Sequence, residues 1–257
     1  MPFALVTGGS KGIGKAIAEA LAIRGYDLLL VARSADLLEQ VSSQIQLTTS
    51  RTCRWFAADL SLDDSAEAVF NWCTENHFEV SILVNNAGYG LSGSFEKHSA
   101  KETAEMLQVN IITLTKLTRL FLPDLLKLSA SYILNIGSSA SYQAVPMLSA
   151  YAASKSYVLN FSRGLYQELK GTPVSVTCVC PGPTDTNFVK RAQIGLRGQK
   201  AAERFNMSPQ TVAQIAVEGL FRKKPEVITG KANKLSAFFA WLLPKNLVEG
   251  IAKKLYD

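Results

Sequence analysis

Short β-rich runs alternate with helical stretches along almost the whole chain of 257 residues. Residues 3–7, 27–32, 53–58, 81–84, 131–136 and 174–180 read as strands, and a last short strand is expected near 226–228. The run 27–32 is continuously apolar after its first residue, as in a strand covered on both faces. This βαβα order predicts an α/β fold with a doubly wound parallel sheet of about seven strands and helices on both faces.

Composition places the chain among soluble globular proteins, because 47% of its residues are hydrophobic and 19% are charged. No linker or internal repeat divides it, so one domain over residues 1–257 is predicted. Residues 184–207 are polar and weakly periodic, which predicts a mobile substrate loop. Residues 231–257 form an apolar tail of two short helices broken at Pro244. The first interpretation of this tail is packing or subunit contact, and the second is contact with lipid.

Several classes of function are disfavoured. The longest apolar run, residues 237–243, is far shorter than the roughly 20 residues that span a bilayer, and no secretory signal is recognisable. A cytoplasmic protein is therefore expected, with membrane contact at most peripheral through the tail. The net charge of +6 is scattered rather than striped, which argues against nucleic acid. Four cysteines and two histidines form no cluster with ligand spacing, so reduced thiols and no metal site are expected.

A glycine-rich segment lies between the first strand and the first helix, which is expected over residues 13–24. It reads Thr7-Gly8-Gly9-Ser10-Lys11-Gly12-Ile13-Gly14. Glycines at such a turn let the backbone approach a pyrophosphate, which then rests on the helix N-terminus. The spacing differs from G-x-G-x-x-G, and an ordinary glycine-rich turn is the alternative. Its position after the first strand favours dinucleotide binding in a Rossmann-type fold.

The end of the second strand indicates which dinucleotide binds. A cofactor with a free ribose 2′-hydroxyl usually meets an acidic side chain there, but this chain has Ala32 and Arg33. Lys11 lies in the neighbouring loop, and Asp27 is at the wrong end of the strand. A 2′-phosphate would therefore meet two cations. NADP(H) is favoured over NAD(H), the alternative being that Arg33 is a solvated surface residue.

Tyr151 and Lys155 lie four residues apart at the start of a helical stretch, so both side chains share one helix face. A free tyrosine has a pKa of about 10, and a fixed ammonium group nearby favours its phenolate form. Such a pair is suited to proton transfer. By itself the pair is also compatible with a half-buried tyrosine beside a surface lysine.

Further motifs accompany this pair in a fixed order. They are Thr7-Gly8-x-x-x-Gly12-x-Gly14, Asp59, Asn85-Asn86-Ala87-Gly88, Asn110, Ser138, Tyr151-x-x-x-Lys155 and Pro181-Gly182. Over residues 3–230 the chain resembles the short-chain dehydrogenase/reductase family. The resemblance implies an NAD(P)-dependent enzyme that transfers a hydride between a carbonyl and an alcohol carbon.

The resemblance also implies a role for each catalytic position. Tyr151 would be the acid in carbonyl reduction and the base in alcohol oxidation. Lys155 would favour the phenolate and bind the nicotinamide ribose. Ser138 would hold the substrate oxygen, with Ser139 the weaker candidate because neighbours on a strand point to opposite faces. Asn110 would hold a water that relays protons to Lys155.

The remaining motif residues are implied to contact the cofactor. Asp59 would meet the adenine ring and Leu60 would line its pocket. Asn85 would support the sheet, and the backbone of Ala87 and Gly88 would lie beside the cofactor ribose. Asn86 would also contact the cofactor. Pro181, Gly182 and Thr186 would lie against the nicotinamide. For Asn86 and Pro181 a purely structural cap or turn is the alternative.

The substrate is less constrained than the chemistry. The pocket is expected to be built from Ser138, residues 143–148, Pro183 and the 184–207 loop, a mixture that suits a 3-oxoacyl thioester, a ketosteroid-like compound or another apolar ketone. The helix around 107–126 is apolar on more than one face, and the corresponding helix of the family forms dimers. A homodimer or homotetramer is therefore predicted.

Two other functions remain open on the sequence. A non-catalytic dinucleotide sensor on the same fold would not need Ser138, Tyr151 and Lys155 together. A nucleotide-sugar epimerase or dehydratase uses a similar tyrosine and lysine pair. Such chains usually carry a larger C-terminal substrate domain, whereas only a tail follows the last strand here.

Overall fold

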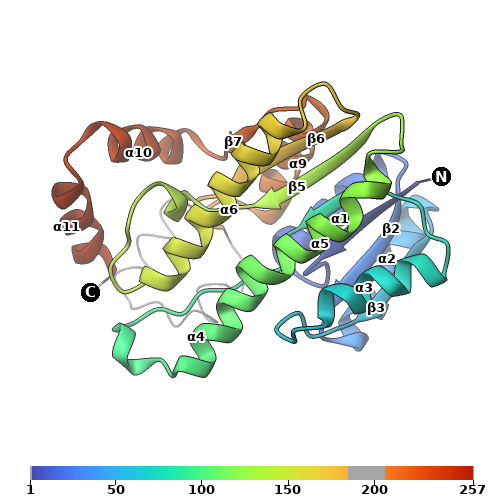
Figure 1. Ribbon diagram of the computed structural model, residues 1–257, viewed down its shortest axis with the longest axis horizontal. Helices are drawn as coiled ribbons and strands as arrows, with labels where there is room; N and C mark the ends of the chain where they lie inside the picture. Colours follow the sequence, from blue (N-terminus) through green and yellow to red (C-terminus); the bar gives the residue numbers. More distant parts are fainter. Residues whose placement is uncertain (1, 185–205, 257) are drawn as a thin grey trace.

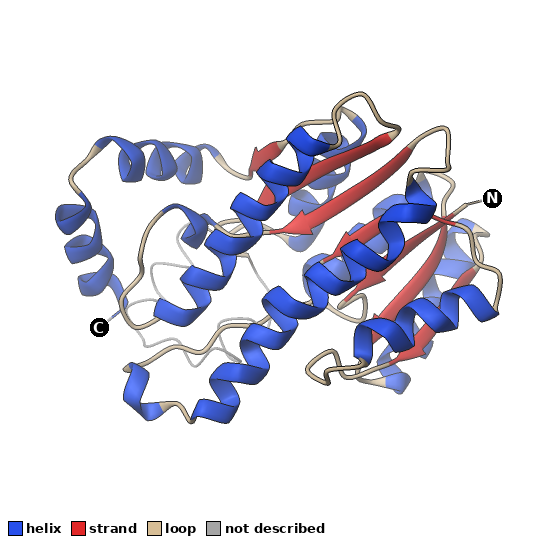
Figure 2. Ribbon diagram, viewed as in Figure 1, coloured by secondary structure: helices blue, strands red, loops and turns tan. Residues whose placement is uncertain are grey.

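The computed structural model describes the backbone of residues 2–184 and 206–256, and the side chains of residues 2–184 and 206–254. Seven parallel strands form one sheet in the order β3-β2-β1-β4-β5-β6-β7 (Figures 1 and 2). The strands are β1 (Phe3–Thr7), β2 (Asp27–Ala32), β3 (Cys53–Ala57), β4 (Val80–Asn85), β5 (Ser131–Ile136), β6 (Val174–Cys180) and β7 (Glu226–Ile228).

Helices cover both faces of the sheet, as Figure 2 shows. In chain order they are α1 (Gly12–Ile23), α2 (Ala35–Thr49), α3 (Ser65–Glu75), η1 (Phe95–Lys97), α4 (Ala100–Leu107), the π-helix η2 (Gln108–Thr113), α5 (Leu114–Leu125), η3 (Ser139–Tyr142), α6 (Ser149–Glu168), α9 (Pro209–Phe221), α10 (Lys231–Leu242) and α11 (Lys245–Tyr256). The predicted doubly wound α/β fold is confirmed.

Alternation along the strands explains the two layers. Successive strand residues point to opposite faces, so Ala4 and Val6 of β1 pack with α1, α2 and α9, whereas Leu5 packs with α3 and α5. All three side chains are completely buried. A strand with both faces covered is predominantly apolar, and this makes these strands recognisable in the sequence.

The predicted strands agree closely with the observed ones. Five of the seven match residue for residue, whereas β3 ends one residue earlier and β4 extends by one residue at each end. The extension of β4 includes Asn85, a polar residue that is nevertheless buried in the sheet. Its amide donates to Asn135 Oδ1 of β5 at 2.9 Å and to Thr118 Oγ1 of α5 at 3.0 Å, so it supports the sheet as the resemblance implied.

The helix expected around 107–126 is interrupted by the π-helix η2, which separates α4 from α5. Met106 of α4 packs with Tyr151, whereas Leu117 and Phe121 of α5 pack beneath the sheet. The change of helix phase explains why apolar residues fall on several faces, because each part faces a different neighbour in the same chain. Ile112 and Leu126 are exposed, and the predicted subunit contact stays a prediction.

The tail forms the two helices that the sequence predicts, with Pro244 between them. In Figure 1 α10 and α11 lie beyond the carboxyl ends of the central strands. Their large apolar side chains are mostly exposed, so packing within the described chain does not explain them. Among residues 2–184 and 206–256, no helix is long and apolar enough to cross a bilayer.

Candidate active site

The glycine-rich turn lies where the strand order reverses, since β1 pairs with β2 on one side and with β4 on the other. Parallel α/β sheets bind their ligands at this point, outside the carboxyl ends of the strands. Gly8 and Gly12 have φ values of 66° and 54°, which side chains rarely adopt. A Cβ at Gly14 would lie 2.3 Å from the carbonyl oxygen of Gly8, so helix α1 approaches the turn too closely for any side chain.

Hydrogen bonds from the end of β4 brace this turn. The amide Nδ2 of Asn86 donates to the carbonyl oxygens of Thr7 at 2.8 Å and Gly8 at 3.2 Å. Thr7 Oγ1 in turn accepts from the backbone N–H groups of Asn86 and Ala87 at 3.0 and 3.1 Å. The side chain of Asn86 therefore has the structural role that was the alternative, and its contact with the cofactor remains a prediction.

The end of β2 bears the cations that the sequence places there. Arg33 follows β2 directly, and Lys11 is the N-cap residue of α1; both are exposed. Asp27 lies at the opposite end of β2, where its carboxylate accepts from the backbone N–H of Thr52 at 2.9 Å. Its charge is therefore remote from the turn, in agreement with the sequence argument. Ser10 and Ile13 lie in the same turn, and Ile13 packs against the core.

Tyr151 and Lys155 lie on the first turns of α6, with side chains that are 8% and 5% exposed. The Lys155 ammonium donates to the carbonyl oxygen of Ile136 at 2.8 Å and lies 6.0 Å from the centre of the Tyr151 ring. Burial penalises the charged form of Lys155 and lowers its pKa to about 8, although Cys178 and Cys180 act in the opposite direction.

Ser138 follows the end of β5 and begins the short helix η3. Its hydroxyl oxygen accepts from the backbone N–H of Ala140 at 3.1 Å. Ser141 Oγ accepts from the Ser138 N–H at 3.2 Å and donates to the Lys155 carbonyl oxygen at 2.8 Å. Ser141 thus ties the Ser138 loop to α6. The sequence pattern did not single out Ser141, because this contact spans fourteen residues.

Asn110 is completely buried in the π-helix. Its Nδ2 donates to the Tyr89 carbonyl oxygen and to Ser154 Oγ, both at 3.0 Å, and its Oδ1 accepts from the Tyr89 N–H at 3.1 Å. Ser154 Oγ donates to the Tyr151 carbonyl oxygen at 2.7 Å. This chain of hydrogen bonds connects the π-helix directly to the first turn of α6.

At Gly88 the segment after β4, the π-helix and α6 lie very close together. A Cβ added there would lie 3.0 Å from Asn110 Oδ1 and 3.2 Å from Lys155 Nζ. Three sequence motifs, the Asn-Asn-Ala-Gly segment, Asn110 and the Tyr151–Lys155 pair, therefore converge at one point. The absence of a side chain at Gly88 is what permits the convergence.

The other predicted cofactor residues occupy the same edge of the sheet. Asp59 Oδ1 accepts from the N–H and hydroxyl of Ser61 at 3.0 and 2.8 Å. The side chain of Leu60 is buried in the core, and its carbonyl oxygen accepts from Thr113 Oγ1 at 2.8 Å. The Pro181 carbonyl oxygen accepts from the Ser139 N–H at 2.7 Å. Thr186 lies outside the described residues, as does most of the 184–207 loop.

Gly182 has a neighbour that sequence reasoning missed. A Cβ there would lie 2.0 Å from Nδ2 of Asn233, which belongs to α10 and donates to the Thr229 carbonyl oxygen at 2.7 Å. The tail thus begins against the segment expected beside the nicotinamide. No local pattern signals this contact, because 51 residues separate the two positions.

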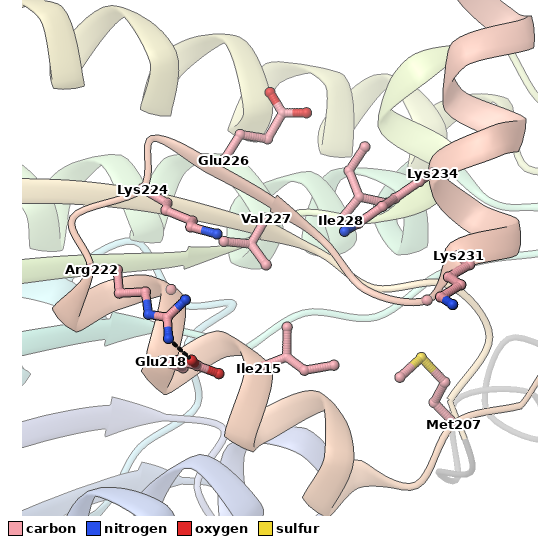
Figure 3. Close-up of a pocket in the computed structure, with 12 residues that line it drawn as sticks. Met207, Ile215, Glu218, Arg222, Lys224, Glu226, Val227, Ile228, Lys231 and Lys234 are labelled. Carbon is pink, nitrogen blue, oxygen red and sulfur yellow. Dashed lines mark ion pairs between the residues drawn. The ribbon is translucent and has the colours of Figure 1, made fainter.

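Two cavities flank this edge. One of about 230 Å³ is lined by Met147, Ser149 and Ala150, immediately before Tyr151, together with Thr103 and six residues between positions 91 and 98. Met147 belongs to the stretch expected to form the substrate pocket, and its φ of 67° is unusual for a residue with a side chain. The second cavity, of about 530 Å³, lies between α9, β7 and α10 (Figure 3). None of Ser138, Tyr151 and Lys155 lines it.

The four cysteines are buried free thiols. Burial raises the pKa of Cys53 to about 11 and that of Cys73 to about 12, so both are protonated at neutral pH. Within the described parts of the chain, no three histidine, cysteine or carboxylate side chains come together as a metal site would require.

Fold and site together define the class of dinucleotide-binding α/β oxidoreductases. The family model for short chain dehydrogenases matches residues 2–195. Mouse very-long-chain 3-oxoacyl-CoA reductase is 36% identical over 194 residues, which cover 73% of this chain and 61% of the mouse protein. The ketoacyl reductase HetN of Nostoc is 28% identical over 229 residues, which cover 88% of this chain and 78% of that protein.

Solved structures agree with this assignment. A short-chain dehydrogenase from Sphingobium yanoikuyae in complex with NADPH matches with a TM-score of 0.83 and 30% identity, covering 94% of both chains. This chain belongs to the short-chain dehydrogenase/reductase family, whose members are oxidoreductases that use NAD(H) or NADP(H). It spans about 61% of the length of the mammalian curated relatives that it matches.

Proposed function

We propose that this protein reduces 3-oxoacyl thioesters to 3-hydroxyacyl thioesters with NADPH. The observation that carries the reaction type is the meeting of Lys155, Asn110 and Gly88 beside Tyr151, at the carboxyl edge of the sheet. The substrate class is supported by the names of the mouse and Nostoc relatives, a 3-oxoacyl-CoA reductase and a ketoacyl reductase. Ketosteroid-like and other apolar ketones are the alternatives.

The glycine-rich turn suits the cofactor, because Gly8 and Gly12 adopt positive φ values and a side chain at Gly14 would clash with the Gly8 backbone. Backbone rather than side chains therefore forms this turn. When bound, the nicotinamide supplies the hydride in reduction and accepts it in oxidation. Two exposed cations, Lys11 and Arg33, favour a 2′-phosphate and hence NADPH, since charge-assisted hydrogen bonds to phosphate are strong.

In this proposal Tyr151 donates its phenolic proton to the carbonyl oxygen as negative charge develops there. Ser138 donates a hydrogen bond to the same oxygen, which stabilises that charge. The Lys155 ammonium stabilises the phenolate that Tyr151 leaves behind. Asn110 keeps the Tyr89 backbone and Ser154 in place, and Ser154 in turn holds the first turn of α6.

The test is NADPH consumption with a panel of carbonyl compounds: 3-oxoacyl-CoA esters of increasing chain length, ketosteroids, diketones and aldehydes. We expect the highest kcat/KM for a 3-oxoacyl thioester. A higher value for a ketosteroid would replace the substrate class but keep the reaction. Tight NADPH binding without turnover of any compound would instead favour a non-catalytic sensor.

A further inference from the structure

Helix α10 exposes its large apolar side chains, whereas an ordinary surface helix buries them. Its inward face carries Asn233, Ala237 and Ala240, spaced four and three residues apart, and the two alanines are buried. Its outward side chains include Phe238, which is 51% exposed, and Trp241, which is 74% exposed. A helix that serves only the core would bury these large apolar residues instead.

The same arrangement continues into α11. Val248 and Ala252 are buried, whereas Leu247 and Ile251, four residues apart, are exposed. Lys245 Nζ donates to the Ala240 carbonyl oxygen at 2.8 Å and joins the two helices. We call the exposed apolar side chains of both helices the C-terminal face; they are Leu235, Phe238, Phe239, Trp241, Leu242, Leu247 and Ile251.

The segment that contains this face is rich in positive charge. Residues 222–254 contain eight lysines and arginines but only two glutamates, a net charge of +6. The whole chain also carries +6, so the remainder is neutral. The excess of positive charge is therefore concentrated in this C-terminal segment, which corrects the expectation that it is scattered along the chain. In Figure 3 Lys224, Lys231 and Lys234 line the 530 Å³ cavity next to α10, where Arg222 pairs with Glu218 at 2.6 Å.

We propose that the C-terminal face docks onto an anionic lipid bilayer, with α10 and α11 lying in the interface. An exposed apolar helix face bordered by lysines is the arrangement that binds such surfaces, through apolar burial together with attraction to lipid phosphates. Within the described residues, Lys231 and Lys234 have no carboxylate partner. Their charges are therefore available to lipid headgroups.

A second copy of the chain fits this face less well. Protein interfaces are depleted of lysine, and a two-fold contact here would bring two clusters of like charge together. An anionic bilayer neutralises the same charges. Through Asn233, which lies against Gly182, and through contacts with η3, α10 also adjoins the candidate active site. Docking would therefore hold the catalytic edge of the sheet near the lipid surface.

The experiment measures sedimentation of the full-length protein with vesicles of phosphatidylcholine, with and without phosphatidylglycerol. It needs no turnover, so its result is independent of the proposed function. We expect binding that requires phosphatidylglycerol and weakens as salt is added. The double variant Lys231→Glu/Lys234→Glu should bind at least roughly tenfold more weakly, because each lysine near an anionic surface contributes about fivefold.

Apolar contacts are tested with Phe238→Ser/Trp241→Ser, which should also reduce binding roughly tenfold or more. Matched controls are Leu47→Ser, at an exposed apolar site on α2, and Lys101→Glu/Lys127→Glu, at exposed lysines on α4 and the loop after α5. Both should bind like the wild type. Circular dichroism confirms that each variant is folded.

Brominated lipids give a direct readout of contact, since they quench tryptophans that enter the bilayer. Quenching should be strong in the wild type and largely lost in Trp241→Phe, which still sediments with the vesicles. Absence of wild-type binding, or binding that neither double variant weakens, would overturn the proposal. A second outcome would also overturn the proposal. If the wild type does not bind vesicles, and light scattering without lipid gives Phe238→Ser/Trp241→Ser a lower molecular mass than the wild type, the face joins subunits instead.

Discussion

Helices α6 and α10 depart from the usual distribution of polar and apolar residues in opposite ways. The first turns of α6 bury a lysine, a tyrosine and the serine at position 154, whereas α10 buries alanines and exposes a phenylalanine and a tryptophan. Buried polar groups and exposed apolar patches are the informative exceptions in a folded protein. In α6 the buried Lys155 and Ser154 donate to carbonyl oxygens inside the chain. The large apolar side chains of α10 are instead exposed.

The largest effect should come from α6. Tyr151→Phe removes the proton donor but retains the ring, so kcat should fall by about 10³-fold or more while the NADPH dissociation constant stays nearly unchanged. The matched control is Tyr157→Phe on the same helix, where the hydroxyl contacts only Thr115 among the described residues. Steady-state kinetics and NADPH fluorescence titration separate the two quantities. Retained turnover would remove the tyrosine from the mechanism.

Stability should distinguish buried from exposed phenylalanines. Phe121→Ala removes a ring that is 3% exposed and should lower the free energy of unfolding by about 3–5 kcal/mol. Phe238→Ala removes a ring on the C-terminal face and should change it by less than about 0.5 kcal/mol. Urea denaturation measures both. A large loss in Phe238→Ala would show that α10 uses this ring for internal packing.

Cofactor preference should respond to one charge at the end of β2. Arg33→Asp exchanges a cation for an anion where the 2′-phosphate is expected, so the ratio of kcat/KM for NADPH to that for NADH should fall roughly tenfold or more. Arg119→Asp, at an exposed position on α5, is the control and should leave the ratio unchanged. An unchanged ratio in Arg33→Asp would contradict the assignment of NADP(H).

The smallest effect concerns pH. Because burial lowers the pKa of Lys155 to about 8, the lysine loses its charge as the pH rises through that value, and the phenolate of Tyr151 loses its stabilisation. The kcat/KM for reduction should therefore decline several-fold above about pH 8, since this parameter reports the pKa values of the free enzyme. In Lys155→Arg the residual activity should lack this decline, because the guanidinium keeps its proton. A decline of the same size in both proteins would exclude the lysine as its cause.

Local patterns predicted the framework well and the long-range contacts poorly. The strands were recognisable because a doubly covered sheet favours apolar runs, and the candidate catalytic positions followed from the resemblance to the family. Gly88 next to Lys155, Ser141 against the Lys155 carbonyl and Asn233 against Gly182 depend on how segments apart in the sequence meet. The burial of Ala237 and Ala240 in place of Phe238 was equally invisible, since apolar content alone does not tell which helix face turns inward.

The π-helix around Asn110 allows the consecutive helices α4 and α5 to pack against two different parts of the protein. A continuous α-helix from residue 100 to 125 would keep a single apolar stripe in phase, and it could not direct Met106 toward Tyr151 while Leu117 and Phe121 face the sheet. The wider turn shifts the angular setting between the two halves. Deleting one residue within 108–113 would restore the regular winding, turn one half away from its contacts and withdraw Asn110 from Tyr89 and Ser154.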